Sequence, residues 1–184
     1  MEQTVENQKK PMGRKIGSIV LLCVAAVLVV AMVLSYFIPK NFAPAVAEPD
    51  YVEVYTSTSQ GKTYNKGSEV YNKIMALHND SFKVTIMDAL LTGNIAESGE
   101  YVEKHSNPRS SNTNYIKFGY NETKTIGSAY HGSYPSYDAI IVVVAETNQL
   151  TSTNVYFMST PTASWVNYQT YAHQSALYNY ILSL

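Results

Sequence analysis

An unbroken apolar run from Ile16 to Ile38 constrains this chain more than any other feature of its sequence. The run contains 23 residues and not one charged side chain. As an α-helix it would be about 34 Å long, which is enough to cross a hydrocarbon core of about 30 Å. Leucine and valine recur on every side of such a helix, so it has no polar face to turn toward water. We therefore predict a transmembrane helix at 16–38.

The charges that flank this run predict its orientation. Four Lys or Arg residues lie between positions 9 and 15, whereas Lys40 is the one basic residue that closely follows the run. Basic residues concentrate on the cytoplasmic side of membrane helices. We therefore predict a cytoplasmic tail at 1–15 and an extracytoplasmic C-terminal part. The expected location is the cell membrane, as a single-pass protein with the lipid bilayer as a partner.

A cleaved signal peptide followed by secretion is the alternative interpretation of the same segment. Ala45-Val46-Ala47 has the small-x-small form that signal peptidase accepts, so cleavage would follow Ala47. Signal-peptide cores usually span about 7 to 15 apolar residues, and the present run is longer. The sequence therefore favours an uncleaved signal anchor.

Beyond the apolar run, the sequence predicts one small domain at 51–184. Segment 39–50 contains three prolines and three alanines and is predicted to be a short extended tether. Within the domain, β-rich runs at 115–125, 137–147 and 154–160 are joined by segments rich in Gly, Ser, Asn and Thr. We predict an antiparallel meander with 137–147 at its centre, because Ile140 to Val144 is apolar on both faces.

The remaining elements complete an α+β domain in two layers, with helices on one face of the sheet. A hairpin is expected from 51–55 and 62–64, and a helix after Ser68 with an apolar stripe at Val70, Ile74 and Leu77. Segment 81–91 fits a strand or a helix, and 94–114 is expected to be a loop with a short strand at 101–103. A second helix is predicted at about 171–182.

Composition excludes several classes of function. From Asn41 onward there are eight Lys and Arg against twelve Asp and Glu, without the basic patch that nucleic-acid binding needs. The single cysteine, Cys23, lies in the apolar run, so the domain has no thiol chemistry and no disulfide. No metal or other cofactor is expected, because the histidines are scattered and each is predicted to be a surface or capping residue: His78, His105, His131 and His173.

Short motifs do not indicate catalysis. Ser59-Gln60-Gly61-Lys62 and Ser110-Ser111-Asn112 match two motifs of penicillin-interacting serine enzymes. The third motif, Lys-Thr-Gly, is missing, and Ser59 lies in a predicted hairpin turn rather than at the start of a helix. We interpret both matches as coincidence.

One loop has the composition of a binding site. The connection between the first two strands of the meander contains four residues of interest, which are the candidate ligand-binding residues: Tyr130, His131, Tyr134 and Tyr137. Tyrosine rings can stack on sugars or anchor a protein partner at low entropic cost. The alternative is that these rings pack on the domain's own core.

The sequence thus predicts a noncatalytic binding or interaction domain held at the cell envelope. A domain without cysteine fits a bacterial envelope. Its partner would be an envelope protein, a peptide or a glycan. Two alternatives stay open at this point: a small membrane-tethered hydrolase with a dispersed site, and a sensor or regulatory subunit that acts through a membrane partner.

Overall fold

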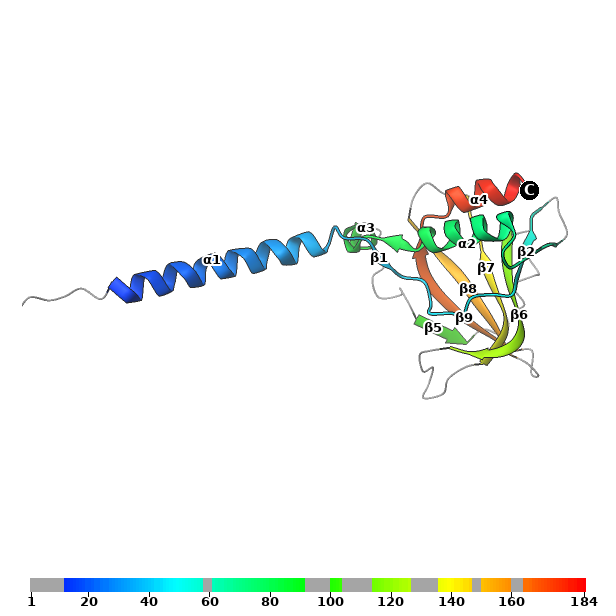
Figure 1. The fold of residues 1–184 in the computed structure, drawn as a ribbon, viewed down its shortest axis with the longest axis horizontal. Coiled ribbons are helices and arrows are strands. Elements are labelled where there is room, and N and C mark those ends of the chain that lie inside the picture. The colour runs from blue at the N-terminus through cyan, green and yellow to red at the C-terminus, as the bar shows by residue number, and fades with distance from the viewer. Residues whose placement is uncertain are drawn as a thin grey trace, which may run out of the picture. The chain divides into compact units, whose positions relative to one another are not determined.

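The chain consists of an N-terminal helix and a folded domain (Figure 1). The computed structural model describes residues 12–57, 61–91, 100–103, 114–126, 136–146, 150–159 and 164–184. Two compact units are present, Met1–Ile38 and Pro39–Leu184. Helix α1 (Met12–Ser35) belongs to the first unit. All other helices and strands of the described residues belong to the second, which is an α+β domain.

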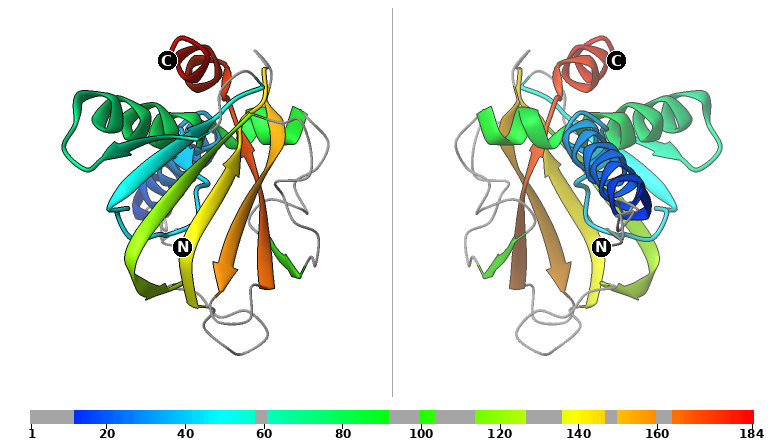
Figure 2. Two further views of the ribbon diagram at one scale, coloured as in Figure 1. Left: turned by 90° about the vertical axis from the view of Figure 1, so that its right-hand side faces the viewer. Right: turned by 90° about the vertical axis from the view of Figure 1, so that its left-hand side faces the viewer.

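The domain is built on a seven-stranded antiparallel sheet with the strand order β3-β2-β6-β7-β8-β9-β5 (Figure 2). The predicted hairpin is confirmed as β2 and β3, and the predicted meander is confirmed as β6, β7 and β8, with β7 in the middle of the sheet. The strands are β2 (Tyr51–Tyr55), β3 (Lys62–Asn65), β5 (Glu100–Glu103), β6 (Tyr115–Thr125), β7 (Ser136–Val143), β8 (Thr151–Ser159) and β9 (Ser164–Ala172).

Helices α2 (Glu69–Ser81) and α4 (Ser175–Leu182) pack on one face of this sheet. The pairing register places Val52, Phe118 and Ile140 side by side on that face. They form one core with residues of the helices, namely Tyr71, Ile74, Leu177 and Ile181. No residue of α1 belongs to any core cluster of the described residues, so the domain's core is complete without that helix.

One of the two predicted helices starts where expected and the other does not. Helix α2 starts after Ser68 as expected, and the Ser68 hydroxyl accepts a hydrogen bond from the Tyr71 N–H (3.3 Å). The C-terminal helix starts only at Ser175, because the preceding residues form β9, a strand that the sequence pattern does not predict. Strand β9 pairs with β8 along nine residue pairs, so Tyr171 and Ala172, which the prediction placed in the helix, are the last residues of this strand.

The linking segment, residues 39–50, is part of the domain rather than a free tether. Its first residues form β1 (Lys40–Asn41), which pairs with β4 (Lys83–Val84). The Phe42 N–H then donates to the Phe82 carbonyl (3.0 Å), and the Asp50 N–H donates to the Gly119 carbonyl (2.9 Å). The segment is therefore hydrogen-bonded to the domain at both ends.

Tyrosine hydroxyls hold the second half of the linking segment. The Tyr120 hydroxyl donates to the Ala47 carbonyl (2.9 Å), and the Tyr137 hydroxyl accepts from the Ala47 N–H (3.1 Å). The Tyr71 hydroxyl donates to the Pro49 carbonyl (2.6 Å). Buried backbone groups need such partners, and here side chains take the place of a neighbouring strand. This gives a structural reason for part of the chain's unusual tyrosine content.

Segment 81–91, which fits either a strand or a helix by sequence, contains both. After β4 the chain enters α3 (Ile86–Leu91). Thr85 caps this short helix, since its hydroxyl accepts from the Asp88 N–H (3.0 Å) and donates to the Asp88 carboxylate (2.6 Å). The first half of the segment thus follows its strand-like alternation, and the second half follows its helical spacing.

His78 is a core residue, which corrects the prediction that it lies at the surface. It is 4% exposed, and its ring packs edge-on against Phe82 (4.9 Å) and Phe118 (4.8 Å). The buried stripe of α2 is Tyr71, Ile74 and His78, shifted by one residue from the predicted stripe. Burial lowers the pKa of His78 from 6.5 to about 3, because the imidazolium would lose its hydration there.

We expect His78 to make the domain less stable in acid. Unfolded histidine binds a proton below its ordinary pKa, whereas folded His78 stays neutral, so the free energy of unfolding is at its full value above pH 6.5 and falls as the pH drops toward 3. The total loss is on the order of 5 kcal/mol. Urea unfolding of His78→Leu at pH 7 and pH 4 should show a smaller difference between the two pH values than the parent chain shows.

His173→Leu is the control for this comparison, since His78 is retained there and the pH dependence should persist. The explanation would be contradicted if His78→Leu kept the full pH dependence of the parent chain.

Candidate functional site

Helix α1 presents an apolar surface on all sides. Its stretch Gly17–Ser35 is long and apolar enough to cross a membrane. The large apolar side chains between Ile19 and Leu34 are 51% to 72% exposed. The one hydroxyl at its C-terminal end, that of Ser35, donates to the Met32 carbonyl within the helix (2.6 Å), so it needs no water. The surface of α1 therefore matches a hydrocarbon environment.

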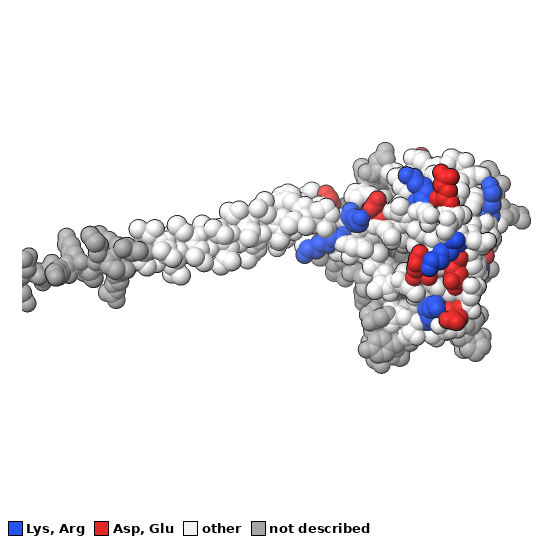
Figure 3. Space-filling model, in the orientation of Figure 1, with Lys and Arg blue, Asp and Glu red and all other residues white. Residues whose placement is uncertain are grey.

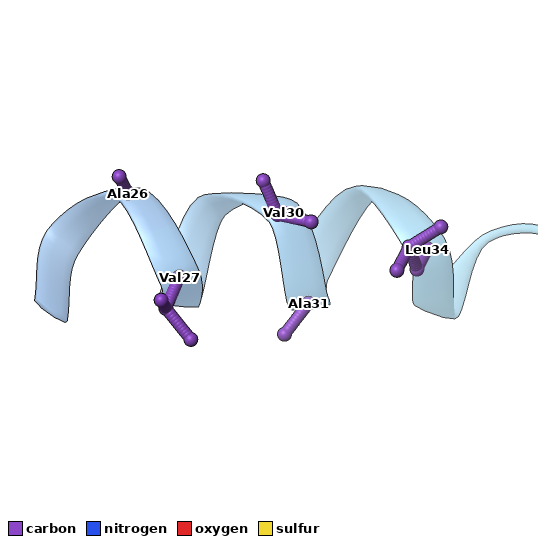
Figure 4. A pocket seen from close by; sticks show the side chains of 5 residues that line it. All are labelled: Ala26, Val27, Val30, Ala31 and Leu34. Carbon is purple, nitrogen blue, oxygen red and sulfur yellow. The ribbon is translucent and has the colours of Figure 1, made fainter. Parts of the chain in front are cut away.

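Shallow hollows lie between the side chains of α1. In the hollow of Figure 4, the small side chains of Ala26 and Ala31 lie next to larger neighbours. Every lining side chain is apolar, so the hollows could receive a lipid chain or another helix but could not orient a polar ligand. One hollow is lined by Ala26, Val27, Val30, Ala31 and Leu34, and another by Cys23, Val24, Val27 and Leu28.

The structure describes one of the four predicted ligand-binding residues. Tyr137 is fully buried, and its ring lies edge-on to Tyr120 (5.2 Å) and Phe157 (5.4 Å). With its hydroxyl bound to the linking segment, Tyr137 packs in the core and is not presented to a ligand. Tyr130, His131 and Tyr134 lie outside the described residues, so a binding role for their loop stays a prediction.

Two of the tyrosines that hold the linking segment, Tyr71 and Tyr120, are protonated at neutral pH and donate hydrogen bonds to it. Burial raises the pKa of Tyr120, and the nearby Tyr137 and Tyr71 add to the effect. Burial, together with the Glu48 carboxylate, raises the pKa of Tyr71 to about 12. Hydroxyls shifted in this direction are suited to a structural role and not to acid–base chemistry near neutral pH.

The sheet face opposite the helices carries a second aromatic cluster, which sequence analysis did not identify. Adjacent strands contribute cross-strand pairs to it, and the rings of Tyr55 and Tyr115 are stacked with their centres 4.5 Å apart. The alternation along β6 could have indicated it, because its neighbours Ile116 and Phe118 face the main core. We call this set the aromatic face: Tyr55, Tyr115, Ile141, Tyr156, Met158 and Trp165.

A partly buried ion pair lies beside the aromatic face. The Lys117 ammonium is 3.1 Å from a carboxylate oxygen of Glu53, and the two side chains are 14% and 16% exposed. The Tyr55 hydroxyl donates to the other carboxylate oxygen (2.6 Å). Lys117 also lies over the ring of Tyr51, 5.9 Å from its centre. The Tyr51 ring covers Gly119, where a Cβ atom would collide with it.

Amide side chains extend this face along β8 and β9. The Asn154 side-chain oxygen accepts from the amides of Asn167 (3.1 Å) and Gln169 (3.4 Å). Asn167 is fully buried, and its own side-chain oxygen has no hydrogen-bond partner among the described residues. Aromatic rings and amides together can stack and exchange hydrogen bonds with a ligand. Within the described ranges, no group of three or more His, Cys, Asp or Glu residues could hold a metal ion.

Charges of both signs alternate on the visible surface of the domain (Figure 3). Three further ion pairs contribute to this pattern: Lys66 with Glu48, Lys83 with Asp80, and Lys124 with Glu122. Such mixed surfaces produce no strong field of one sign and therefore give no electrostatic signature of a highly charged ligand on this side.

Comparison with known proteins reveals no relative: no family model, no curated protein and no solved structure matches the chain.

We expect Lys117, which pairs with Glu53, to contribute more to the free energy of unfolding than Lys83, which pairs with Asp80. Lys117→Met should lower the free energy of unfolding by about 2–3 kcal/mol, because it leaves the Glu53 carboxylate without its cation in a mostly buried place. Lys83→Met should cost less than about 1 kcal/mol, since that pair is solvent-exposed. Urea denaturation of both variants measures the difference. Equal losses would contradict a structural role for the Lys117 pair.

Proposed function

We propose that this chain is a single-pass membrane protein that displays a noncatalytic binding domain outside the cytoplasm. One observation supports the anchor above all others: the domain's core needs nothing from α1, while α1 exposes apolar side chains all around. No residue of α1 takes part in a core cluster of the described residues. Lipid is the partner that its surface fits.

Leaving the apolar side chains of α1 in water carries a large free-energy cost. Twelve large apolar side chains between Ile19 and Leu34 are more than half exposed. At about 1.5–3 kcal/mol for each fully buried side chain, keeping them in water forgoes stabilisation on the order of 10 kcal/mol. That is comparable to the whole stability of a typical domain, about 5–15 kcal/mol. Membrane insertion relieves this penalty without any change in the domain.

The excess of basic residues before the apolar run, at Lys9, Lys10, Arg14 and Lys15, supports a cytoplasmic N-terminus. The linking segment supports an uncleaved chain, because cleavage after Ala47 would remove β1 and Phe42 from the domain. The Phe42 carbonyl accepts hydrogen bonds from Thr170 (2.7 Å) and Tyr168 (3.3 Å). A cleaved product would leave both hydroxyls without this acceptor.

The binding role rests on the tyrosine-rich loop between β6 and β7. Tyr130, His131 and Tyr134 stand in this connection, and loops that join the strands of a rigid sheet often carry binding residues. Tyrosine supplies a large contact area with few rotatable bonds. The partner we propose is a protein, peptide or glycan of the cell envelope, held close to the membrane by the anchor.

Binding to detergent-extracted, insoluble envelope material tests this function. The full chain in detergent should co-sediment with the material, and Tyr130→Ala combined with Tyr134→Ala should lose most of that binding, since both rings would be removed from the loop. The matched control is Asn72→Ala combined with Lys73→Ala, two exposed residues of α2. This control should bind like the parent chain. Undiminished binding by the folded tyrosine variant would contradict the proposed role of the loop.

A further inference from the structure

We propose that α3 is a second membrane contact, which inserts its exposed leucines into the outer surface of the bilayer in which α1 is anchored. This inference rests on the proposed membrane anchor. It goes beyond the anchor because it assigns a lipid-binding surface to the folded domain itself.

Exposed leucines on α3 are the first observation. Leu91 is 78% exposed and Leu90 is 39% exposed. Among the described residues after Ile38, the only other large apolar side chains with such exposure are Leu182 and Leu184 at the C-terminus. Leu90 and Leu91 are therefore the only adjacent pair of large apolar residues with such exposure among the described side chains of the domain.

The position of α3 in the chain topology is the second observation. Strand β4 pairs with β1 so that Val84 lies opposite Lys40, and α3 starts two residues after Val84 (Figure 1). Lys40 in turn follows Ser35, the last residue of α1, by five positions. Five residues of extended chain cover at most about 18 Å. The covalent chain therefore keeps the β1–β4 pair, and α3 with it, close to the end of the membrane helix in any orientation of the domain.

The local structure of α3 suits an interfacial contact. Thr85 and Asp88 stabilise its first turn through their capping hydrogen bonds. The two leucines of its last turn therefore belong to a helix with an ordered start. Exposed Lys40 lies opposite Val84 on the neighbouring strand, two residues before the start of α3, and a basic residue near apolar side chains is typical of segments that lie at the level of the lipid head groups.

A contact by two leucines would be weak for a free domain but is effective for an anchored one. The anchor turns lipid binding by α3 into an intramolecular event, in which the local concentration of membrane is very high. The expected consequence is a domain held in one orientation at the bilayer surface.

Single-cysteine labelling of the full chain in vesicles of zwitterionic and anionic lipid tests this inference. Cys23 is the only native cysteine, so Leu91→Cys in a Cys23→Ser background carries one polarity-sensitive fluorophore on α3. Leu182→Cys in the same background is the matched control, an exposed leucine (45%) at the end of α4. We expect a blue-shifted emission and a loss of intensity with nitroxide-bearing lipid at position 91, and neither effect at position 182.

The parent chain labelled at Cys23 separates the two proposals. If the Cys23 probe is quenched by nitroxide lipid and the position 91 probe behaves like the one at position 182, the α3 contact is refuted and the anchor stands. If the Cys23 probe is not quenched either, the anchor itself is refuted, and the inference about α3 falls with it. Circular dichroism of each variant confirms that the labelled chains are folded.

Discussion

The apolar surface of α1 is the constraint on which the rest of this account depends. The side chains from Ile19 to Leu34 can neither join the domain's core, which is already complete, nor remain in water at low cost. In a bilayer these side chains would contact lipid chains. The helix backbone would need no water there, because its hydrogen bonds are internal. The proposed function of the domain follows from this placement, because an anchored α1 would confine a domain that starts at Pro39 to the membrane surface.

Tyrosine side chains hold the segment that links α1 to the sheet. The linking segment has few strand partners of its own, so its carbonyl and N–H groups meet hydroxyls of Tyr71, Tyr120 and Tyr137 instead. These rings also fill the core, so one residue type both packs and bonds. Because tyrosine has both of these structural roles, its abundance in the chain does not by itself indicate ligand binding.

Much of the fold is predictable from sequence because its signals are local. The apolar run, the alternation along 115–125 and the doubly apolar Ile140 to Val144 each specify an element and its burial. The features that the sequence did not predict depend on contacts between residues far apart in the chain. Strand β9 depends on its ladder with β8, and the linking segment depends on hydroxyls up to 128 residues away, as for Phe42 and Thr170. The aromatic face likewise forms only when the strands pair. On α2, the buried positions are Tyr71 and His78 in place of the predicted Val70 and Leu77, and this change brings His78 into the core.

Translation into mammalian microsomes measures the central claim most directly, because the domain carries its own reporters of sidedness. Asn79-Asp80-Ser81 and Asn121-Glu122-Thr123 are glycosylation sequons, and both asparagines are exposed. A spanning α1 with its N-terminus in the cytoplasm predicts a chain that resists alkaline extraction and is glycosylated, with the modification absent in the Asn79→Gln and Asn121→Gln double variant. An unmodified chain released by alkaline extraction would contradict the account.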